Sequence, residues 1–121
     1  MEKKRILIVD DDPSTIKLLE GILTKQGYEV LISLDGIDAM VQVKMHKPDL
    51  IILDVMMPDV NGYDVCRNIK FDSPYKAVPI ILLTAREQEI DTRVSQMMGI
   101  TYVHKPFERE AFLNKIQQMI K

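Results

Sequence analysis

The chain has 121 residues and a mass of 14.0 kDa, the size of one domain with a substantial buried core. Its 16 Lys and Arg residues against 18 Asp and Glu give a net charge of -2, which excludes a general attraction to nucleic acid or anionic lipid. No apolar run approaches the roughly 20 residues of a membrane span, and the charged opening does not resemble a signal sequence. We therefore expect one soluble, cytoplasmic domain over residues 1–121, without direct contact to nucleic acid or membrane.

Short hydrophobic runs rich in β-branched residues alternate with longer segments whose apolar residues have helical spacing. In chain order, the predicted elements are a strand at Ile6–Val9, a helix from about Ser14 that ends near Gly27, a strand at Val30–Ile32, a helix around Ala39–Val43 that ends before Pro48, a strand at Leu50–Leu53, a helix over Gly62–Ile69, a strand at Pro79–Leu83, a helix around Ile90–Met98 that ends at Gly99, a strand at Thr101–Val103 and a helix over Phe112–Ile120. The strict alternation of five strands and five helices predicts a doubly wound α/β sandwich.

Three of the predicted strands, at Ile6–Val9, Leu50–Leu53 and Ile80–Leu83, are apolar without interruption. Such runs are typical of central strands in a parallel sheet, because helices cover both faces of these strands. In this class of fold, ligands bind beyond the carboxyl ends of the strands, near the point where the strand order reverses. Functional side chains are therefore expected just after the strands.

The single cysteine, Cys66, excludes an internal disulfide and cannot build a metal site by itself. It lies between Val65 and Ile69 on the apolar face of a predicted helix. Since free cysteine is commonly buried, we interpret Cys66 as an inert core residue.

Carboxylate, hydroxyl and ammonium side chains that could form one site follow the first, third, fourth and fifth predicted strands. They are Asp10, Asp11 and Asp12 after the first strand, Asp54 after the third, Thr84 after the fourth and Lys105 after the fifth. Carboxylates from separate strands repel each other unless a cation lies between them, and hard oxygen ligands of this kind suit Mg²⁺. An ammonium and a hydroxyl beside the same carboxylate favour phosphoryl transfer, with the carboxylate as nucleophile. Because the chain has no G-x-x-x-x-G-K phosphate loop, the phosphoryl donor is expected to come from outside.

Four motifs in this order extend over nearly the whole chain. They are ILIVDDD at Ile6–Asp12, PDLIILDVMMPDVNG at Pro48–Gly62, PIILLTA at Pro79–Ala85 and YVHKPF at Tyr102–Phe107. Together they resemble the receiver domain of response regulators in two-component signalling and phosphorelays. The resemblance implies a flavodoxin-like, five-stranded parallel sheet of order 2-1-3-4-5 with five helices, as in chemotaxis regulators.

The resemblance also assigns the acidic residues. It implies that Asp54 is the phosphoacceptor and that Asp10, Asp11, Asp54 and the backbone carbonyl of Met56 hold a Mg²⁺ cofactor. Asp12 is expected to lie just outside this set. Taken alone, Asp10 and Asp11 also fit the acidic start of a helix.

Three further residues carry the implied switch. Thr84 is the hydroxyl that moves to the phosphoryl group, Lys105 is the ion partner of that group, and Tyr102 turns inward on activation. The Lys105-Pro106 peptide bond is expected to be cis. Members of the family differ in how they use the aromatic position, so Tyr102 as an ordinary half-buried ring stays open.

The resemblance implies a signalling module rather than an enzyme, with self-phosphorylation and slow self-dephosphorylation only. The implied partners are a sensor histidine kinase or histidine phosphotransfer protein, a downstream protein target or an output domain, and a second copy through the surface of the fourth helix, fifth strand and fifth helix. The chain itself leaves no room for an output domain, so it is either a stand-alone regulator or one domain of a longer protein.

Two other classes of function compete with this interpretation. Asp10 and Asp12 have the D-x-D spacing of Mg²⁺-dependent phosphohydrolases, but the chain has no cap segment for a substrate, and Asp54 is better placed as nucleophile. A binding module that no longer takes phosphate is the second alternative. The complete set Asp10, Asp11, Asp54, Thr84 and Lys105 argues against it.

Overall fold

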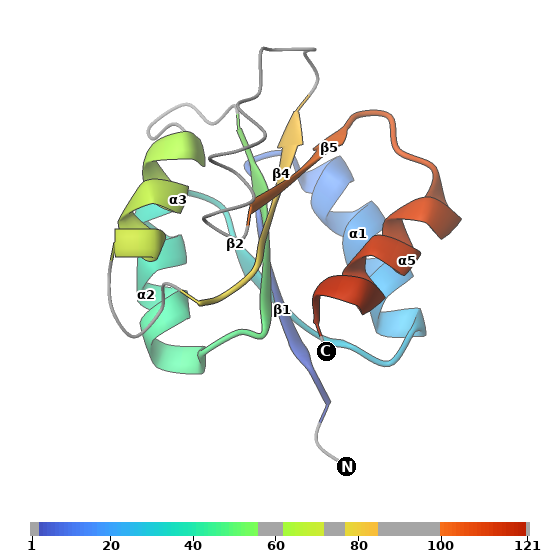
Figure 1. Cartoon of the computed structure of the whole chain (residues 1–121), viewed down its shortest axis with the longest axis horizontal. Coiled ribbons are helices and arrows are strands. Elements are labelled where there is room, and N and C mark those ends of the chain that lie inside the picture. Colours follow the sequence, from blue (N-terminus) through green and yellow to red (C-terminus); the bar gives the residue numbers. More distant parts are fainter. Residues whose placement is uncertain (1–2, 56–61, 72–76, 85–99, 121) are drawn as a thin grey trace.

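The computed structural model describes residues 3–55, 62–71, 77–84 and 100–120 (Figure 1). Its elements are β1 (Arg5–Val9), α1 (Pro13–Lys25), β2 (Glu29–Ser33), α2 (Gly36–His46), β3 (Leu50–Asp54), α3 (Gly62–Phe71), β4 (Ile80–Thr84), β5 (Ile100–His104) and α5 (Arg109–Met119). All five predicted strands are confirmed, and so are four of the predicted helices. The predicted helix around Ile90–Met98 lies outside the described residues.

The five strands form one parallel sheet in the order β2-β1-β3-β4-β5, which confirms the predicted topology. Helices α1 and α5 cover one face of this sheet, and α2 and α3 cover the other (Figure 1). The order reverses between β1 and β3, so the carboxyl ends of these two neighbouring strands flank the crevice in which ligands of such sheets bind.

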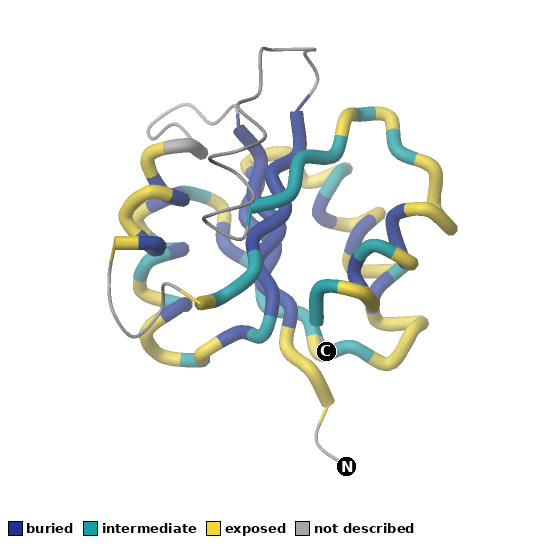
Figure 2. The backbone as a smooth tube through the Cα atoms, viewed as in Figure 1, coloured by how far each residue is buried: buried dark blue, intermediate teal, exposed yellow. Residues whose placement is uncertain are grey.

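The core consists of two apolar clusters, one on each face of the sheet. Alternate residues of β1 show the division: Ile6 and Ile8 belong to the cluster under α1 and α5, whereas Leu7 and Val9 belong to the cluster under α2 and α3. The three central strands are buried on both faces (Figure 2). Their uninterrupted apolar runs are therefore explained, as predicted, by helices that cover both faces of the sheet.

Capping aspartates, glycine and proline define the ends of α1 and α2. Asp12 is the N-cap of α1, with Pro13 directly after it, and Gly27 follows the helix at φ 94°, a conformation that favours glycine. Asp35 is the N-cap of α2, which ends before Pro48, as predicted. The cap of α1 is thus Asp12 and neither Asp10 nor Asp11.

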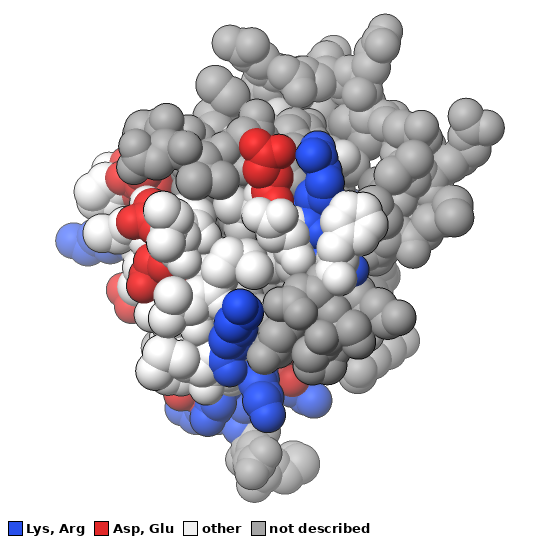
Figure 3. Space-filling view, turned by 90° about the vertical axis from the view of Figure 1, so that its left-hand side faces the viewer, with Lys and Arg blue, Asp and Glu red and all other residues white. Residues whose placement is uncertain are grey.

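The amino-terminal end of β1 is held by Arg5. Its N–H donates to Oδ2 of Asp49 (2.8 Å), its Nε donates to Oε2 of Glu29 (3.0 Å), and its Nη1 donates to the carbonyl of His46 in the last turn of α2 (2.9 Å). Figure 3, viewed from the side of α2 and α3, shows Lys and Arg side chains gathered at the end of the molecule that carries the N-terminus. Arg5 therefore ties β1, β2 and α2 together, at the end of β1 opposite Asp10.

Cys66 is 2% exposed in the cluster under α2 and α3, as predicted. Burial raises the pKa of its thiol to about 11, so the thiolate is scarce at neutral pH. Among the described residues, none of the helices has the length and apolar character to cross a membrane.

Candidate functional site

Asp10 lies directly after β1 and is 1% exposed. Its Oδ1 accepts a hydrogen bond from the N–H of Asp12 (2.9 Å), and its own N–H donates to the carbonyl of Ser33 (3.1 Å). Its Oδ2 is buried and has no hydrogen-bond partner within the described part of the chain. This carboxylate oxygen is in an ion pair with Nζ of Lys105 at 3.8 Å, and as an acceptor without a hydrogen bond it suits a cation.

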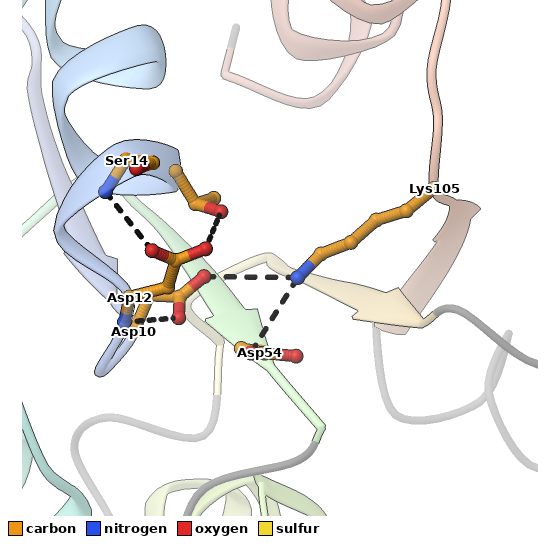
Figure 4. A network of polar contacts seen from close by, with 6 residues as sticks. Asp10, Asp12, Ser14, Asp54 and Lys105 are labelled. Atoms are coloured by element: carbon orange, nitrogen blue, oxygen red, sulfur yellow. Dashed lines mark hydrogen bonds and ion pairs between the residues drawn. The ribbon is translucent and has the colours of Figure 1, made fainter.

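Asp54 is the last residue of β3 and is also buried. Lys105 reaches it from the segment after β5, because the Lys105 N–H donates to the carbonyl of Thr84 (2.8 Å) and so extends the pairing of β4 and β5. The Nζ of Lys105 lies 3.5 Å from Oδ2 of Asp54 and 3.8 Å from Oδ2 of Asp10 (Figure 4). One ammonium therefore faces both carboxylates.

Asp11 completes an acidic cluster with these two residues. Asp10, Asp11 and Asp54 each offer a carboxylate oxygen, and these oxygens lie within 4.8 Å of one another. Asp10 and Asp54 are buried, whereas Asp11 is exposed to solvent. A set of hard oxygen donors with one open side fits Mg²⁺, which retains several water ligands. The fourth predicted ligand, the carbonyl of Met56, lies outside the described residues.

Asp12 is outside this cluster, as expected. Its carboxylate accepts hydrogen bonds from the N–H of Ser14 (3.0 Å) and from Oγ1 of Thr15 (3.0 Å), so it is occupied in capping α1 (Figure 4). Of the three consecutive aspartates, Asp10 and Asp11 therefore belong to the acidic cluster and Asp12 caps α1.

The electrostatics of the cluster are unfavourable without a cation. Burial raises the pKa of Asp10 from 3.8 to about 6, and the negative charge of Asp54 adds to this effect. The hydrogen bond from Asp12 and the charge of Lys105 act in the opposite direction but are outweighed. A divalent ion between the carboxylates would stabilise their ionised forms.

The remaining predicted site residues lie on β4 and β5. Thr84 ends β4, is buried, and pairs with His104 of β5. Tyr102 of β5 is half-buried and packs against the cluster under α2 and α3. The Lys105-Pro106 peptide bond is cis, as predicted.

Sequence reasoning did not single out Ser33, whose carbonyl accepts the Asp10 N–H, or Asp38, which contacts Ser33. Ser33, the last residue of β2, is 1% exposed, and its Oγ donates a hydrogen bond to Oδ2 of Asp38 in the first turn of α2 (2.5 Å). A serine directly after the predicted strand Val30–Ile32, with an aspartate just before the predicted helix around Ala39–Val43, is the only signal that the sequence carries for this contact.

Comparison with known proteins places the chain in a family. The sequence model of the response regulator receiver domain matches residues 6–117. The DNA-binding response regulator MtrA of Mycolicibacterium smegmatis is 37% identical over 120 residues, which are 98% of this chain and 51% of that protein. Protein PilH of Pseudomonas aeruginosa is 34% identical, and the match covers 96% of this chain and 97% of PilH.

Solved structures of response regulators have the same fold as this chain. A response regulator of Chloroflexus aurantiacus, described as putative, has a TM-score of 0.89 at 31% identity, and 98% of each chain is covered. The chemotaxis protein CheY4 of Vibrio cholerae has a TM-score of 0.87 at 30% identity, and 98% of this chain and 99% of that chain are covered. The chain belongs to the response regulator receiver domain family, which confirms the resemblance drawn from its motifs.

Receiver domains are the signalling domains of two-component response regulators and are generally not enzymes. They interact with kinases and output domains, and they bind Mg²⁺ at an acidic pocket. The chain spans about half the length of the MtrA proteins that it matches.

Proposed function

We propose that this receiver domain accepts a phosphoryl group on Asp54 and that Asp10, Asp11, Asp54 and the carbonyl of Met56 hold the Mg²⁺ that assists the transfer. The observation that carries the proposal is the placement of the Asp54 carboxylate, with Nζ of Lys105 at 3.5 Å and carboxylate oxygens of Asp10 and Asp11 within 4.8 Å. When bound, Mg²⁺ supplies positive charge to the oxygens of the transferred group.

In the proposed transfer, a carboxylate oxygen of Asp54 forms a bond to phosphorus while the bond from phosphorus to the donor nitrogen of a phosphohistidine breaks. The departing imidazole nitrogen keeps the electron pair and takes a proton from solvent, and the product is an aspartyl phosphate. Lys105 opposes the charge on the transferred oxygens from a fixed position beside Asp54. No base is needed, because a carboxylate is already an ionised nucleophile.

The response to the modification is part of the proposal. Phosphorylation adds charge and acceptor oxygens at Asp54, which attracts the Thr84 hydroxyl from the end of the adjacent strand β4. Tyr102 then turns inward, and the surface formed by the fourth predicted helix, β5 and α5 changes its shape. Two packings that differ by only a few kcal/mol suffice for such a switch.

The proposed partners follow from this scheme. A sensor histidine kinase or histidine phosphotransfer protein in the cytoplasm supplies the phosphoryl group. The changed surface then binds a downstream protein, an output domain or a second copy of the domain. The chain spans about half of the DNA-binding response regulator MtrA, whereas it spans nearly all of PilH.

The proposal is tested by the intact mass of the protein after incubation with acetyl phosphate at neutral pH, with and without Mg²⁺. We expect addition of one phosphoryl group that requires Mg²⁺ and is lost in Asp54→Asn. Asp12→Asn is the matched control, because Asp12 is an aspartate of the same crevice that is occupied in capping α1. Failure of the folded parent to take up a phosphoryl group would favour a phosphate-independent binding module. Continuous hydrolysis of acetyl phosphate that is lost when Asp10 is replaced, but not when Asp54 is replaced, would favour a phosphohydrolase.

A further inference from the structure

The main chain of Asp10 is hydrogen-bonded to Ser33, the last residue of β2. Ser33 pairs with Val9 in the β1–β2 register, and the Ser33 carbonyl accepts the Asp10 N–H at 3.1 Å, one position beyond the last strand residue of β1. The hydrogen bond to its side chain comes from the Asp12 N–H, within the same loop. The Ser33 carbonyl thus helps to fix the main chain of Asp10, in addition to the pairing of β1 with β3 that sets Asp10 beside Asp54.

Ser33 is in turn fixed by α2. Its hydroxyl donates to Oδ2 of Asp38 at 2.5 Å, within the range of a hydrogen bond between a hydroxyl and an ionised carboxylate. Because Ser33 is 1% exposed, loss of this acceptor would leave a buried hydroxyl without a replacement from solvent. The contact is a partly buried hydrogen bond that links the sheet to the helix.

Asp38 has little freedom to follow a displaced Ser33. Its N–H donates to Oδ1 of the N-cap Asp35 at 2.7 Å, and the N–H of Ala39 donates to the Asp35 carbonyl at 3.1 Å. Asp38 thus belongs to the first, capped turn of α2. A continuous series of hydrogen bonds runs from this turn through Asp38 and Ser33 to Asp10.

We propose that Ser33 and Asp38 are positioning residues for the cation site and act by fixing the main chain of Asp10. The inference rests on the proposed function, because it takes Asp10 as a ligand. Partners that orient metal ligands directly are worth roughly 10- to 100-fold in metal affinity. The hydrogen bond between Ser33 and Asp38 reaches the Asp10 carboxylate only through the main chain of Asp10. We therefore expect a smaller loss of Mg²⁺ affinity, of about 3- to 10-fold for either residue.

The test compares Mg²⁺ dissociation constants, measured by calorimetry, for the parent, Ser33→Ala, Asp38→Ala and the double variant. Each single change is expected to raise the dissociation constant about 3- to 10-fold, and the double change no further, because both remove one hydrogen bond. Asp38→Asn keeps an acceptor oxygen for the Ser33 hydroxyl but removes the charge. If Asp38→Asn binds Mg²⁺ nearly as tightly as the parent, the effect is one of positioning. If it loses as much affinity as Asp38→Ala, the negative charge of Asp38 rather than its hydrogen bond is responsible, and the proposal is overturned.

The control variant is Arg5→Ala, which loosens the same strand and the same helix at their other ends, through Glu29 and His46. It is expected to lower stability and leave the Mg²⁺ dissociation constant unchanged. A second readout, hydrogen exchange of the Asp10 amide without Mg²⁺, should accelerate in Ser33→Ala and Asp38→Ala but not in Arg5→Ala. Unchanged affinity and exchange in these two variants would overturn the inference. A parent that binds no Mg²⁺ would overturn the proposed function instead, and the exchange measurement would still decide on positioning.

Discussion

The ammonium of Lys105 lies 3.5 Å from Oδ2 of Asp54 and 3.8 Å from Oδ2 of Asp10, so a single cation faces carboxylates at the carboxyl ends of two different strands. In this position it reduces the repulsion between the carboxylates, but the pKa of Asp10 is nevertheless raised to about 6 by burial and by Asp54. The cluster of Asp10, Asp11 and Asp54 therefore holds more negative charge than Lys105 neutralises, and a divalent cation is the group that would relieve it.

Lys105→Met removes the ammonium and keeps much of the length of the side chain. We expect phosphoryl incorporation from acetyl phosphate to slow at least about tenfold, because one charge that stabilises the transferred oxygens is lost. Binding of Mg²⁺ should tighten, since Lys105 no longer competes for the same carboxylates. Lys44→Met, an exposed change on α2, is the control. Equal losses of Mg²⁺ binding and phosphoryl incorporation would contradict a role for Lys105 in transfer.

Asp10→Asn should stabilise the protein when Mg²⁺ is absent. A folded-state pKa of about 6 against 3.8 means that the contribution of Asp10 to stability is fully present below pH 4 and is lost as the pH rises through 6. The variant should thus gain on the order of 2 to 3 kcal/mol over the parent at neutral pH and little at pH 4. Urea unfolding at both pH values measures the difference. A variant that is less stable than the parent at pH 7.5 would show that Asp10 is not electrostatically strained.

Mg²⁺ affinity should depend on pH through the same carboxylate. Because Asp10 must be ionised to bind the cation, affinity is expected to be nearly constant above pH 7 and to fall by up to about tenfold per unit below pH 6. Calorimetry in buffers of different ionisation enthalpy should also detect proton release near pH 6. Constant affinity between pH 7.5 and pH 5 would contradict the raised pKa of Asp10.

Cys66 should resist thiol reagents while the protein is folded. It is 2% exposed, and burial raises its pKa to about 11, so both access and thiolate are lacking at pH 8. We expect labelling by an aromatic disulfide reagent to be slow in buffer and rapid in urea, followed by absorbance. Complete labelling of the native protein within the mixing time would disprove the core assignment.

The sequence predicts the strands and the strand-end residues well because both follow simple rules. Uninterrupted apolar runs identify β1, β3 and β4 as central strands. The rule that ligands bind at the carboxyl ends of parallel strands then brings Asp10, Asp54 and Lys105 together, as the structure has them. The observed strands extend further at polar ends such as Arg5 and Ser33, because backbone pairing does not require an apolar side chain.

Contacts between side chains of separate elements could not be predicted in this way. Ser33 and Asp38 are each ordinary at a strand end and in the first turn of a helix, and nothing in their spacing indicates that they bond to one another behind Asp10. The same holds for Arg5, whose contact with the His46 carbonyl depends on where α2 ends in space. Such contacts depend on the packing of the helices, which periodicity alone does not determine.

The most direct test of the central claim is to locate the phosphoryl group on the chain. After incubation with acetyl phosphate and Mg²⁺, borohydride reduces an aspartyl phosphate to homoserine, and peptide mass spectrometry then identifies the position. We predict homoserine at position 54 and nowhere else, at a yield that falls to background without Mg²⁺. Homoserine at Asp10, Asp11 or Asp12, or none in a folded and Mg²⁺-loaded protein, would contradict the assignment of Asp54 as the phosphoacceptor.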